Sequence, residues 1–349
     1  MSYFFQIPGI KRVLFLVMAA AAFEPSPSLS QEPAKNKKEL GTFTLQFEND
    51  LFYGADRQYT NGLRLSWVSP KGDESFEQVE WIRDVLEKVS FRKNAETRFG
   101  FAAGQEIYTP EDRKRSDLII DDRPYAGWLY GAMSLHSETK KPWYRELESI
   151  ELNLGIVGPQ AFGQETQDLI HNIRVIDLFE GWGNQLKNEP GVLLMYERKW
   201  RFFDPVPLGP LHFDIVPHAG ASLGNVLTHV NVGGSVRYGY NIPKDFGPPS
   251  LIKGLTSMDT IPEAKLSLYV FAGTEGRYVA RNIFLDGNTF ADSHSVKKNR
   301  WVADFSVGVA LIYRRFKISY TNALRTREFV GQKNNARFGS ISASWQMFF

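Results

Sequence analysis

The sequence predicts an all-β protein, a twelve-stranded antiparallel transmembrane β-barrel with a short helix in one outward loop. Three observations predict this fold class. Apolar and polar residues alternate along most of the 349 residues, several alternating segments are long enough to cross a membrane as tilted strands, and aromatic residues, 14% of the chain, flank many of them. A soluble β-sandwich is the alternative, but its strands usually have only about five or six residues. The segment lengths therefore favour the barrel.

Alternation defines the individual strands. In Phe43–Glu48 the odd positions are apolar and the even positions polar, and Ser340–Phe349 shows the same period most clearly. The candidate strands centre near residues 45, 64, 103, 130, 152, 196, 215, 235, 270, 307, 319 and 343. An even number of strands puts both ends of the barrel chain on the periplasmic side.

The connections after odd-numbered strands then face outward. They are residues 50–58, 109–123, 158–188, 224–229, 282–298 and 326–336. Two inward connections, 69–97 and 241–264, are long. Apolar positions in the first have helical spacing, which we interpret as a helix that caps the barrel end.

The first residues have the features of a secretory signal. A basic pair precedes the apolar run 13–23, and small residues end the segment near Ser30. The run is too short to cross about 30 Å of hydrocarbon, which favours a cleaved signal over an anchor helix. We therefore expect a signal peptide over residues 1–30, a polar leader over residues 31–40 and the barrel over residues 41–349.

The composition excludes several kinds of chemistry. The chain has no cysteine, which rules out a disulfide framework, a thiolate zinc site and a cysteine nucleophile. Its net charge of +2 gives no reason to expect nucleic-acid binding. The stretch Gly220–Gly224 matches the nucleophile-elbow pattern around Ser222, but it ends an alternating segment and is interpreted as a strand end.

The long connection 158–188 is a candidate for function, because long loops in compact domains are often functional. Residues 164–173 are predicted to form a helix. Its spacing places Gln164, Gln167, Asp168 and His171 on one face. A polar face turned to solvent is the alternative interpretation.

A second polar cluster flanks the first outward connection. Strand phase places Asp50 and Thr60 on the polar sides of the first and second strands, so antiparallel pairing brings them together at the outer rim. Oxygen ligands of this kind suit a hard cation such as Ca²⁺. Polar residues that merely finish a hairpin are the alternative.

Four stretches of the chain resemble the lipid A 3′-O-deacylase family of Gram-negative outer membranes. They are Phe47–Asp50, Tyr59–Gly62, Asp122–Trp128 and Gly158–His171, and they keep the family's order. The resemblance implies a twelve-stranded barrel, in agreement with the strand count, and a Ca²⁺-dependent esterase. Matched position by position, it implies that Asn49, Asp50, Thr60 and His171 are essential and that Gln167 belongs to the active site.

The resemblance also implies a lipid phosphate partner for basic residues of the outward loops. The basic residue expected in 109–123 aligns with Arg113, Lys114 or Arg115, and we take Lys114 and Arg123 as substrate-binding residues. Solvated loop charge is the alternative. The first outward loop is shorter than in some family members.

These assignments give a mechanistic hypothesis in which His171 is the general base for attack by water on the ester. The group that orients its ring is Gln167, Asp168 or Asp177. Asp50, with Asn49, holds Ca²⁺, which polarises the ester carbonyl.

We expect a monomer embedded in the outer membrane, with its site toward the cell surface and lipid A as its partner. Two other functions stay open. One is an outer-membrane phospholipase, which needs a serine nucleophile, and the other is a non-enzymatic porin or adhesin barrel.

Overall fold

The computed structural model describes residues 39–50, 58–70, 95–175, 177–247 and 266–348. The described strands are β1 (Glu39–Asn49), β2 (Gln58–Val68), β3 (Glu96–Thr109), β4 (Ala126–Lys140), β5 (Arg145–Val157), β6 (Glu189–Arg201), β7 (Val206–Leu208), β8 (Leu211–Gly224), β9 (Leu227–Tyr240), β10 (Leu266–Asn282), β11 (Trp301–Tyr313), β12 (Phe316–Arg325) and β13 (Ala336–Phe348). The described helices are α3 (Gly163–Arg174), α4 (Ile283–Asp286) and the 3-10 turns η3 (Pro159–Ala161) and η4 (Trp182–Asn184). None of them is long and apolar enough to cross a membrane.

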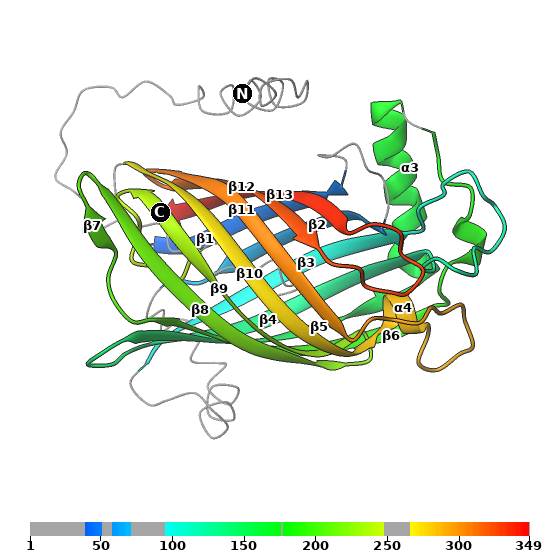
Figure 1. Ribbon diagram of the computed structural model, residues 1–349, viewed down its shortest axis with the longest axis horizontal. Helices are drawn as coiled ribbons and strands as arrows, with labels where there is room; N and C mark the ends of the chain where they lie inside the picture. The colour runs from blue at the N-terminus through cyan, green and yellow to red at the C-terminus, as the bar shows by residue number, and fades with distance from the viewer. Residues whose placement is uncertain (1–38, 51–57, 71–94, 176, 248–265, 349) are drawn as a thin grey trace. The chain divides into compact units, whose positions relative to one another are not determined.

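Twelve long strands close into one antiparallel barrel (Figure 1). Neighbouring strands pair in sequence order, β13 pairs with β1, and β6 pairs with β8 past the three-residue β7. The prediction of a twelve-stranded barrel is confirmed, because each predicted centre falls within one long strand. The pairing of Glu39 with Phe348 puts the start of β1 and the end of β13 at the same end of the barrel. We call this the terminal end, and the opposite end, which carries α3 and α4, the loop end.

The strand β1 begins earlier than the sequence predicts. Glu39 and Leu40 belong to it, although the predicted leader extends to residue 40. The predicted signal peptide, the rest of the leader and the apolar stripe of connection 69–97 lie outside the described residues.

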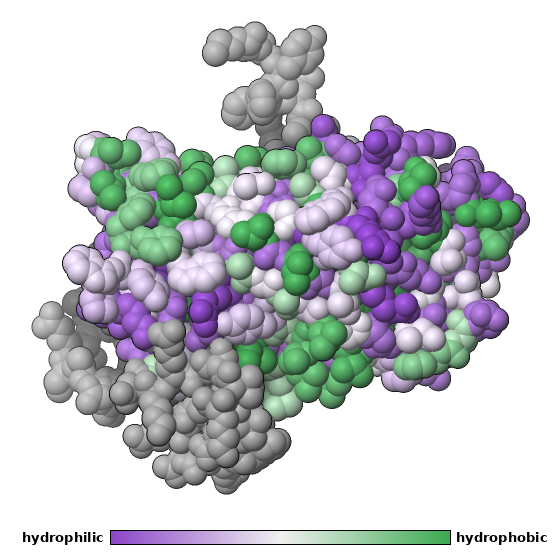
Figure 2. Space-filling view, turned by 60° about the horizontal axis from the view of Figure 1, so that its bottom comes forward, coloured by the Kyte–Doolittle hydropathy of each residue, from purple (hydrophilic) through white to green (hydrophobic). Residues whose placement is uncertain are grey.

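The barrel wall separates apolar and polar side chains by strand phase. Phe43 and Leu45 are exposed on the outside, whereas Thr42 and Thr44, which alternate with them, are buried in the interior. In Figure 2 hydrophobic side chains lie over the middle of the wall, and hydrophilic ones gather toward the loop end. A wall of this kind is suited to contact with lipid.

Aromatic pairs flank this apolar belt at both ends, as the aromatic excess predicts. At the terminal end the Phe316 and Trp345 rings stack with centroids 5.8 Å apart. At the loop end Tyr278 and Trp301 meet edge to face at 5.1 Å. Girdles of this type mark the two membrane–water interfaces of outer-membrane barrels.

The interior is filled by charged side chains that are paired. Arg64 donates to Glu151 at 2.8 Å, and Arg237 bonds the carboxylates of Asp214 and Asp245. Pairing offsets the large cost of removing these charges from water. Cavities of about 50 and 20 Å³ remain among the described interior residues.

The short helix α4 closes the loop end of the interior. Its residues Ile283, Phe284 and Leu285 are buried, and Phe284 stacks on Tyr108 of β3 with ring centroids 3.9 Å apart. The Asn282 side chain caps the helix by accepting from the Phe284 backbone N–H at 3.1 Å. Apolar packing therefore seals the interior just below the loops.

Candidate active site

A row of residues crosses the outside of the wall at the loop end. Asn49 on β1 pairs with Asn61 on β2, Asn61 with Ile107 on β3, and Ile107 with Gly127 on β4. Strand phase points all four positions to the outside of the barrel, as it does Leu63. Leu63 is exposed, yet the four residues of the row are buried. Something outside the wall therefore covers this row.

Over β3 and β4 the cover is the segment that contains η3 and α3, which contacts both strands (Figure 1). Gly127 permits this approach, since a Cβ there would lie 3.1 Å from both the Ala161 Cβ and the Gly163 Cα. Its carbonyl accepts from the Gly158 N–H at 3.0 Å. Gln105, on the outer face of β3, donates to the Ala161 carbonyl at 2.6 Å. Backbone contacts thus fix the start of α3 against the wall.

The sequence prediction of a helix over residues 164–173 is confirmed, with one residue added at each end in α3. The polar side of α3, as predicted from residue spacing, is partly turned toward the barrel wall. Gln167 and His171 are 2% and 1% exposed, whereas Gln164 lies on the open side. This face is therefore not simply a solvated surface.

The chain after α3 returns to pack under the helix. Phe179 and Trp182 form a buried cluster with Tyr125 and Ile107 of the wall. The Trp182 indole N–H donates to the Gln167 Oε1 at 3.0 Å. This bond orients the Gln167 amide, and no described residue accepts from its buried Nε2. Gln167 thus presents an N–H donor inside the covered site.

His171 is held by the same returning segment. Its Nδ1 lies 2.7 Å from the Asp177 backbone carbonyl, and its ring packs against Phe179 with centroids 5.6 Å apart. A carbonyl only accepts hydrogen bonds, so Nδ1 carries the proton and Nε2 holds the lone pair. Of the three orienting groups that the sequence leaves open, Asp177 makes this bond, through its backbone rather than its carboxylate.

Asp168 lies on the same helix, one turn before His171. Partial burial raises the pKa of Asp168 above its ordinary value, while a hydrogen bond with Gln164 and the nearby His171 act in the opposite direction. Its carboxylate stands at the edge of the covered site. The ring of His171 bonds the Asp177 carbonyl instead.

The residues predicted to hold a cation lie at the other side of the row. Asn49 ends β1 and Asp50 follows it directly, and both side chains are buried. The pairing of Asn49 with Asn61 leaves Asp50 and Thr60 as the next residues along the two chains. The register between β2 and β3 shifts between Tyr59 and Asn61, which places a bulge at Thr60. The Thr60 side chain itself lies outside the described residues, so its role stays a prediction.

This donor set fits a hard cation. Asp50 supplies a carboxylate and Asn49 an amide oxygen, and the buried Asn61 Oδ1 has no hydrogen-bond partner among the described residues. Ca²⁺ accepts such a mixture of carboxylate, amide and carbonyl oxygens. The described residues contain no cluster of three His, Cys, Asp or Glu side chains, so a cation here would depend on amide and carbonyl oxygens beside one carboxylate.

Asn61 is a candidate site residue that sequence reasoning did not select, although it lies within the quoted stretch Tyr59–Gly62. Strand phase places it on the outside, the side opposite to that of Thr60, which suggested lipid contact. A polar residue at a lipid-facing phase was the available signal in the sequence. The burial of Asn61 is seen only in the folded structure.

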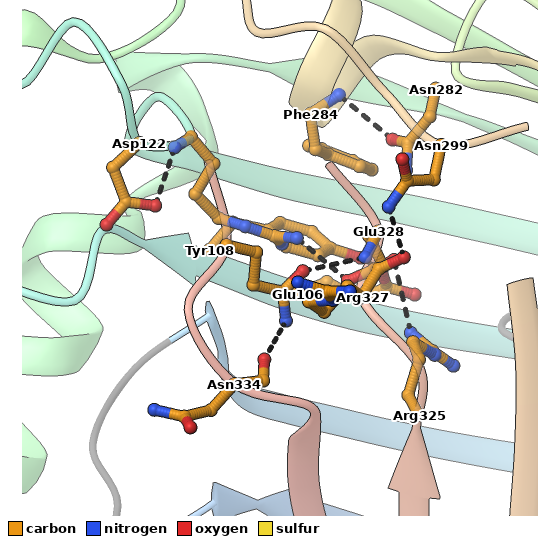
Figure 3. Close-up of polar contacts among 12 residues, drawn as sticks. Glu106, Tyr108, Asp122, Asn282, Phe284, Asn299, Arg325, Arg327, Glu328 and Asn334 are labelled. Atoms are coloured by element: carbon orange, nitrogen blue, oxygen red, sulfur yellow. Dashed lines mark hydrogen bonds and ion pairs between the residues drawn. The ribbon is translucent and has the colours of Figure 1, made fainter. Parts of the chain in front are cut away.

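Arg123, expected to bind a lipid phosphate, lies beside Tyr108 and Glu328, which are labelled in Figure 3. Its side chain is buried, and it donates to the Glu328 Oε2 at 2.8 Å. The guanidinium also lies over the Tyr108 and Phe329 rings, at 5.5 and 5.7 Å from their centroids. A buried arginine paired in this way joins two loops, and the role of Arg123 in binding substrate stays a prediction.

Lys114 keeps the position expected of it. It is exposed in the loop 109–123, and its backbone N–H donates to the Asp112 Oδ1 at 3.1 Å. This loop is tied to the segment after α3, because the Glu180 N–H donates to the Arg113 carbonyl at 3.0 Å. Lys114 therefore lies on a loop beside the covered site, and its role in binding substrate stays a prediction.

The fold and the site together define a class of protein: a membrane β-barrel whose candidate active site lies outside its wall, beneath a helix. The chain belongs to the family of outer membrane protein LpxR, whose family model matches residues 13–347. Membership places the protein in the outer membrane of a Gram-negative bacterium.

One solved structure shares this fold. The structure of LpxR from Salmonella typhimurium is similar with a TM-score of 0.67 and 22% identity, over 88% of this chain and 100% of that chain. The β domain of the Bordetella autotransporter Brka gives a TM-score of 0.43 and 8% identity, over 89% and 100% of the two chains. No curated protein sequence matches this chain.

Proposed function

We propose that the protein is an esterase of the outer membrane that hydrolyses the 3′-linked acyloxyacyl chain of lipid A, with its site toward the cell surface. Family membership and the four motifs support the substrate class. The observation that carries the proposal is the buried His171, whose Nδ1 faces the Asp177 carbonyl at 2.7 Å on the lipid-facing side of the wall.

In the proposed reaction His171 acts as the general base. Its Nε2 takes a proton from a water molecule, and the water oxygen bonds to the ester carbonyl carbon. The tetrahedral species then breaks its bond to the 3′ oxygen of the sugar, which receives the proton back from the imidazolium. The Asp177 carbonyl stabilises this imidazolium, because it accepts a hydrogen bond that strengthens when the ring is charged.

Other residues of the chain bind and orient the ester. The Gln167 Nε2 is a buried donor near the base, and it is held by Trp182. Asp50, Asn49 and Asn61 would hold Ca²⁺, which when bound supplies positive charge to the carbonyl oxygen in the transition state. Lys114 is available on the adjacent loop for a phosphate group of the same lipid.

The test of this proposal is mass spectrometry of lipid A from cells that express the wild-type protein or His171→Ala. We expect the variant to release the 3′ chain about 10²- to 10⁴-fold more slowly, the range that a general base contributes. Asn172→Ala is the matched control, because Asn172 is exposed on the same helix turn. Release at the wild-type rate by a folded His171→Ala barrel would remove His171 from the mechanism.

The proposed cation has a test of its own. Removal of calcium by a chelator should stop the reaction, and calcium but not magnesium should restore it, since Mg²⁺ demands a smaller and more regular site. Asp50→Asn should raise the calcium concentration needed for half-maximal activity and weaken calcium binding measured by titration calorimetry. Full activity in excess chelator contradicts the cation.

The phospholipase alternative requires an activated serine. Inside the barrel His136 contacts Ser134 and Ser149, and His229 contacts Ser222, which alone of these serines lies in the nucleophile-elbow pattern Gly220–Gly224. Ser222 and His229 are both buried, with the hydroxyl 2.6 Å from Nδ1. However, Ser222 donates its proton to the Leu227 carbonyl at 3.1 Å, so it accepts from the imidazole. This is opposite to the polarity that activates a nucleophile. The strand β8 ends at Gly224 without a following helix, which confirms the strand-end interpretation.

A further inference from the structure

The helix α3 has an exposed side that does not suit water. Leu169 is 60% and Ile173 74% exposed, while the polar Gln167 and His171 are buried against the wall. A helix on the surface of a water-soluble domain shows the reverse arrangement, with its apolar stripe turned inward. This inversion needs a surrounding that is apolar on one side of the helix.

The residues of α3 fall into three sectors around the helix axis. Gly163, Gln167 and His171 follow one another at intervals of four and face the wall. Leu169 and Ile173 share a second sector, one turn apart. The third sector is polar and at least partly open to solvent, and its members are Gln164, Glu165, Asp168 and Asn172. One side of the helix thus meets protein, one is apolar and one is polar.

The apolar sector is continuous with the lipid-facing belt of the barrel. The exposed Phe162 directly precedes α3, and its carbonyl accepts from Gln105 at 3.2 Å. The Cα partners of Gln105 on the neighbouring strands are Leu63 and Leu129, which are both exposed on the outer face. The belt therefore extends to the point where α3 begins.

We infer that α3 lies in the membrane–water interface, with Leu169 and Ile173 in contact with the acyl chains of the adjacent lipid leaflet. The polar sector then faces the head groups and water, where Gln164, Glu165 and Asn172 are exposed. Interfacial helices bind lipid through such a division of apolar and polar sides. This inference rests on the barrel and on α3, and does not require the proposed esterase activity.

The absence of cysteine makes the inference directly testable, because each introduced thiol is labelled alone. Single variants Leu169→Cys and Ile173→Cys receive an environment-sensitive fluorophore, and the full-length barrel is reconstituted in phosphatidylcholine vesicles that contain lipids with brominated acyl chains. Gln164→Cys and Asn172→Cys are the matched controls on the polar sector. Leu154→Cys, exposed on the outer face of β5, is the lipid reference.

We expect brominated lipid to quench labels at residues 169 and 173 as it quenches the label at 154. Aqueous iodide should quench them several-fold less than the labels at 164 and 172. Quenching by iodide equal to that of the controls, without quenching by lipid, would overturn the inference. Protection from both quenchers would overturn it too, because a protein surface would then cover the helix. Neither outcome depends on hydrolysis, so it leaves the proposed function to its own test.

Discussion

At His171 a backbone carbonyl, not a side chain, selects which ring nitrogen carries the proton. The carbonyl of Asp177 reaches the ring because α3 ends at Arg174 and Val175 adopts φ 57°, which turns the chain back under the helix. The left-handed region costs an L-residue about 1–2 kcal/mol, and a β-branched residue is among the least tolerant of it. The protein thus accepts local strain where the chain reverses to orient the ring.

This arrangement predicts that the carboxylates near His171 are dispensable. Asp177→Ala keeps the backbone carbonyl and should retain most of the wild-type rate of acyl release, as should Asp168→Asn. The raised pKa of Asp168 means that the folded protein binds the carboxyl proton more tightly than the unfolded protein does. Stability therefore falls as the pH rises from the pKa of Asp168 in the unfolded protein through its higher pKa in the folded protein. At neutral pH Asp168→Asn should therefore unfold no more easily than wild type.

The measurement is the initial rate of 3′ acyl release from lipid A in mixed micelles, with thermal unfolding followed in parallel. A fall in rate for Asp168→Asn as large as that for His171→Ala would assign the orienting role to Asp168. A similar fall for Asp177→Ala alone would assign it to the Asp177 carboxylate.

Residue spacing was enough to predict that Gln167 and His171 share a helix face, but not what meets that face. The Asp177 contact depends on a valine in a conformation that its side chain disfavours, which no propensity argument predicts. The Arg123 pairing depends on Glu328, which is 205 positions away in the sequence. Contacts of both kinds come from tertiary structure, so the sequence left open which group orients His171 and did not predict the pairing of Arg123.

At the scale of elements, the close contact between α3 and the wall depends on glycine, which has no side chain to keep the two apart. Gly127 and Gly163 touch where the helix begins. A Cβ added to either glycine would lie only 3.1 Å from the Cα of the other. Helices and strands were predictable as elements, since α3 follows helical spacing and the strands alternate. The docking of α3 on the strands was not predictable, because a single glycine leaves no pattern of hydrophobicity in the sequence.

We predict that Gly127→Val shifts α3 away from the wall and lowers the rate of acyl release by about 10²-fold, the cost of roughly an ångström of misplacement in an active site. The matched control is Gly131→Val, on the same outer face of β4. A Cβ at Gly131 would have no neighbour nearer than the Ala102 carbonyl at 4.0 Å.

Both glycine variants should form barrels that resist unfolding by detergent, as judged by heat-modifiable migration on gels. Equal activity of Gly127→Val and Gly131→Val would show that the seat of α3 does not set the geometry of the site. A loss of the folded barrel in Gly127→Val alone would show that the contact serves the wall itself.

At the scale of the whole molecule, the described residues make a barrel with a candidate site on its outer surface and an interior occupied by side chains. Paired charges fill its interior, and α4 seals the loop end with apolar packing. The number of strands was predictable from period and length, because each strand has one lipid-facing side. Whether the interior is filled could not be predicted from the sequence. The polar residues of a strand alternate in the same way whether they line a water-filled channel or pair with one another.

A closed interior predicts little conductance. Planar bilayers that contain the purified protein should show no stable open channel, in contrast with a water-filled porin. Phe284→Ala, which removes the ring stacked on Tyr108, is expected to loosen the seal and serves to show that the assay detects an opened barrel. Steady single-channel currents from the wild-type protein would favour the porin alternative.

The site row begins on β1, the strand whose pairing with β13 closes the barrel. Asn49 is held on one side by its pairing with Asn61 and on the other by its pairing with Gly339, near the far end of the sequence. The cation residues therefore take their final places only when the last strand joins the first. Completion of the proposed site and completion of the barrel are one event. Under the proposed function, a chain still being assembled into the membrane therefore has no finished centre with which to attack the lipids around it.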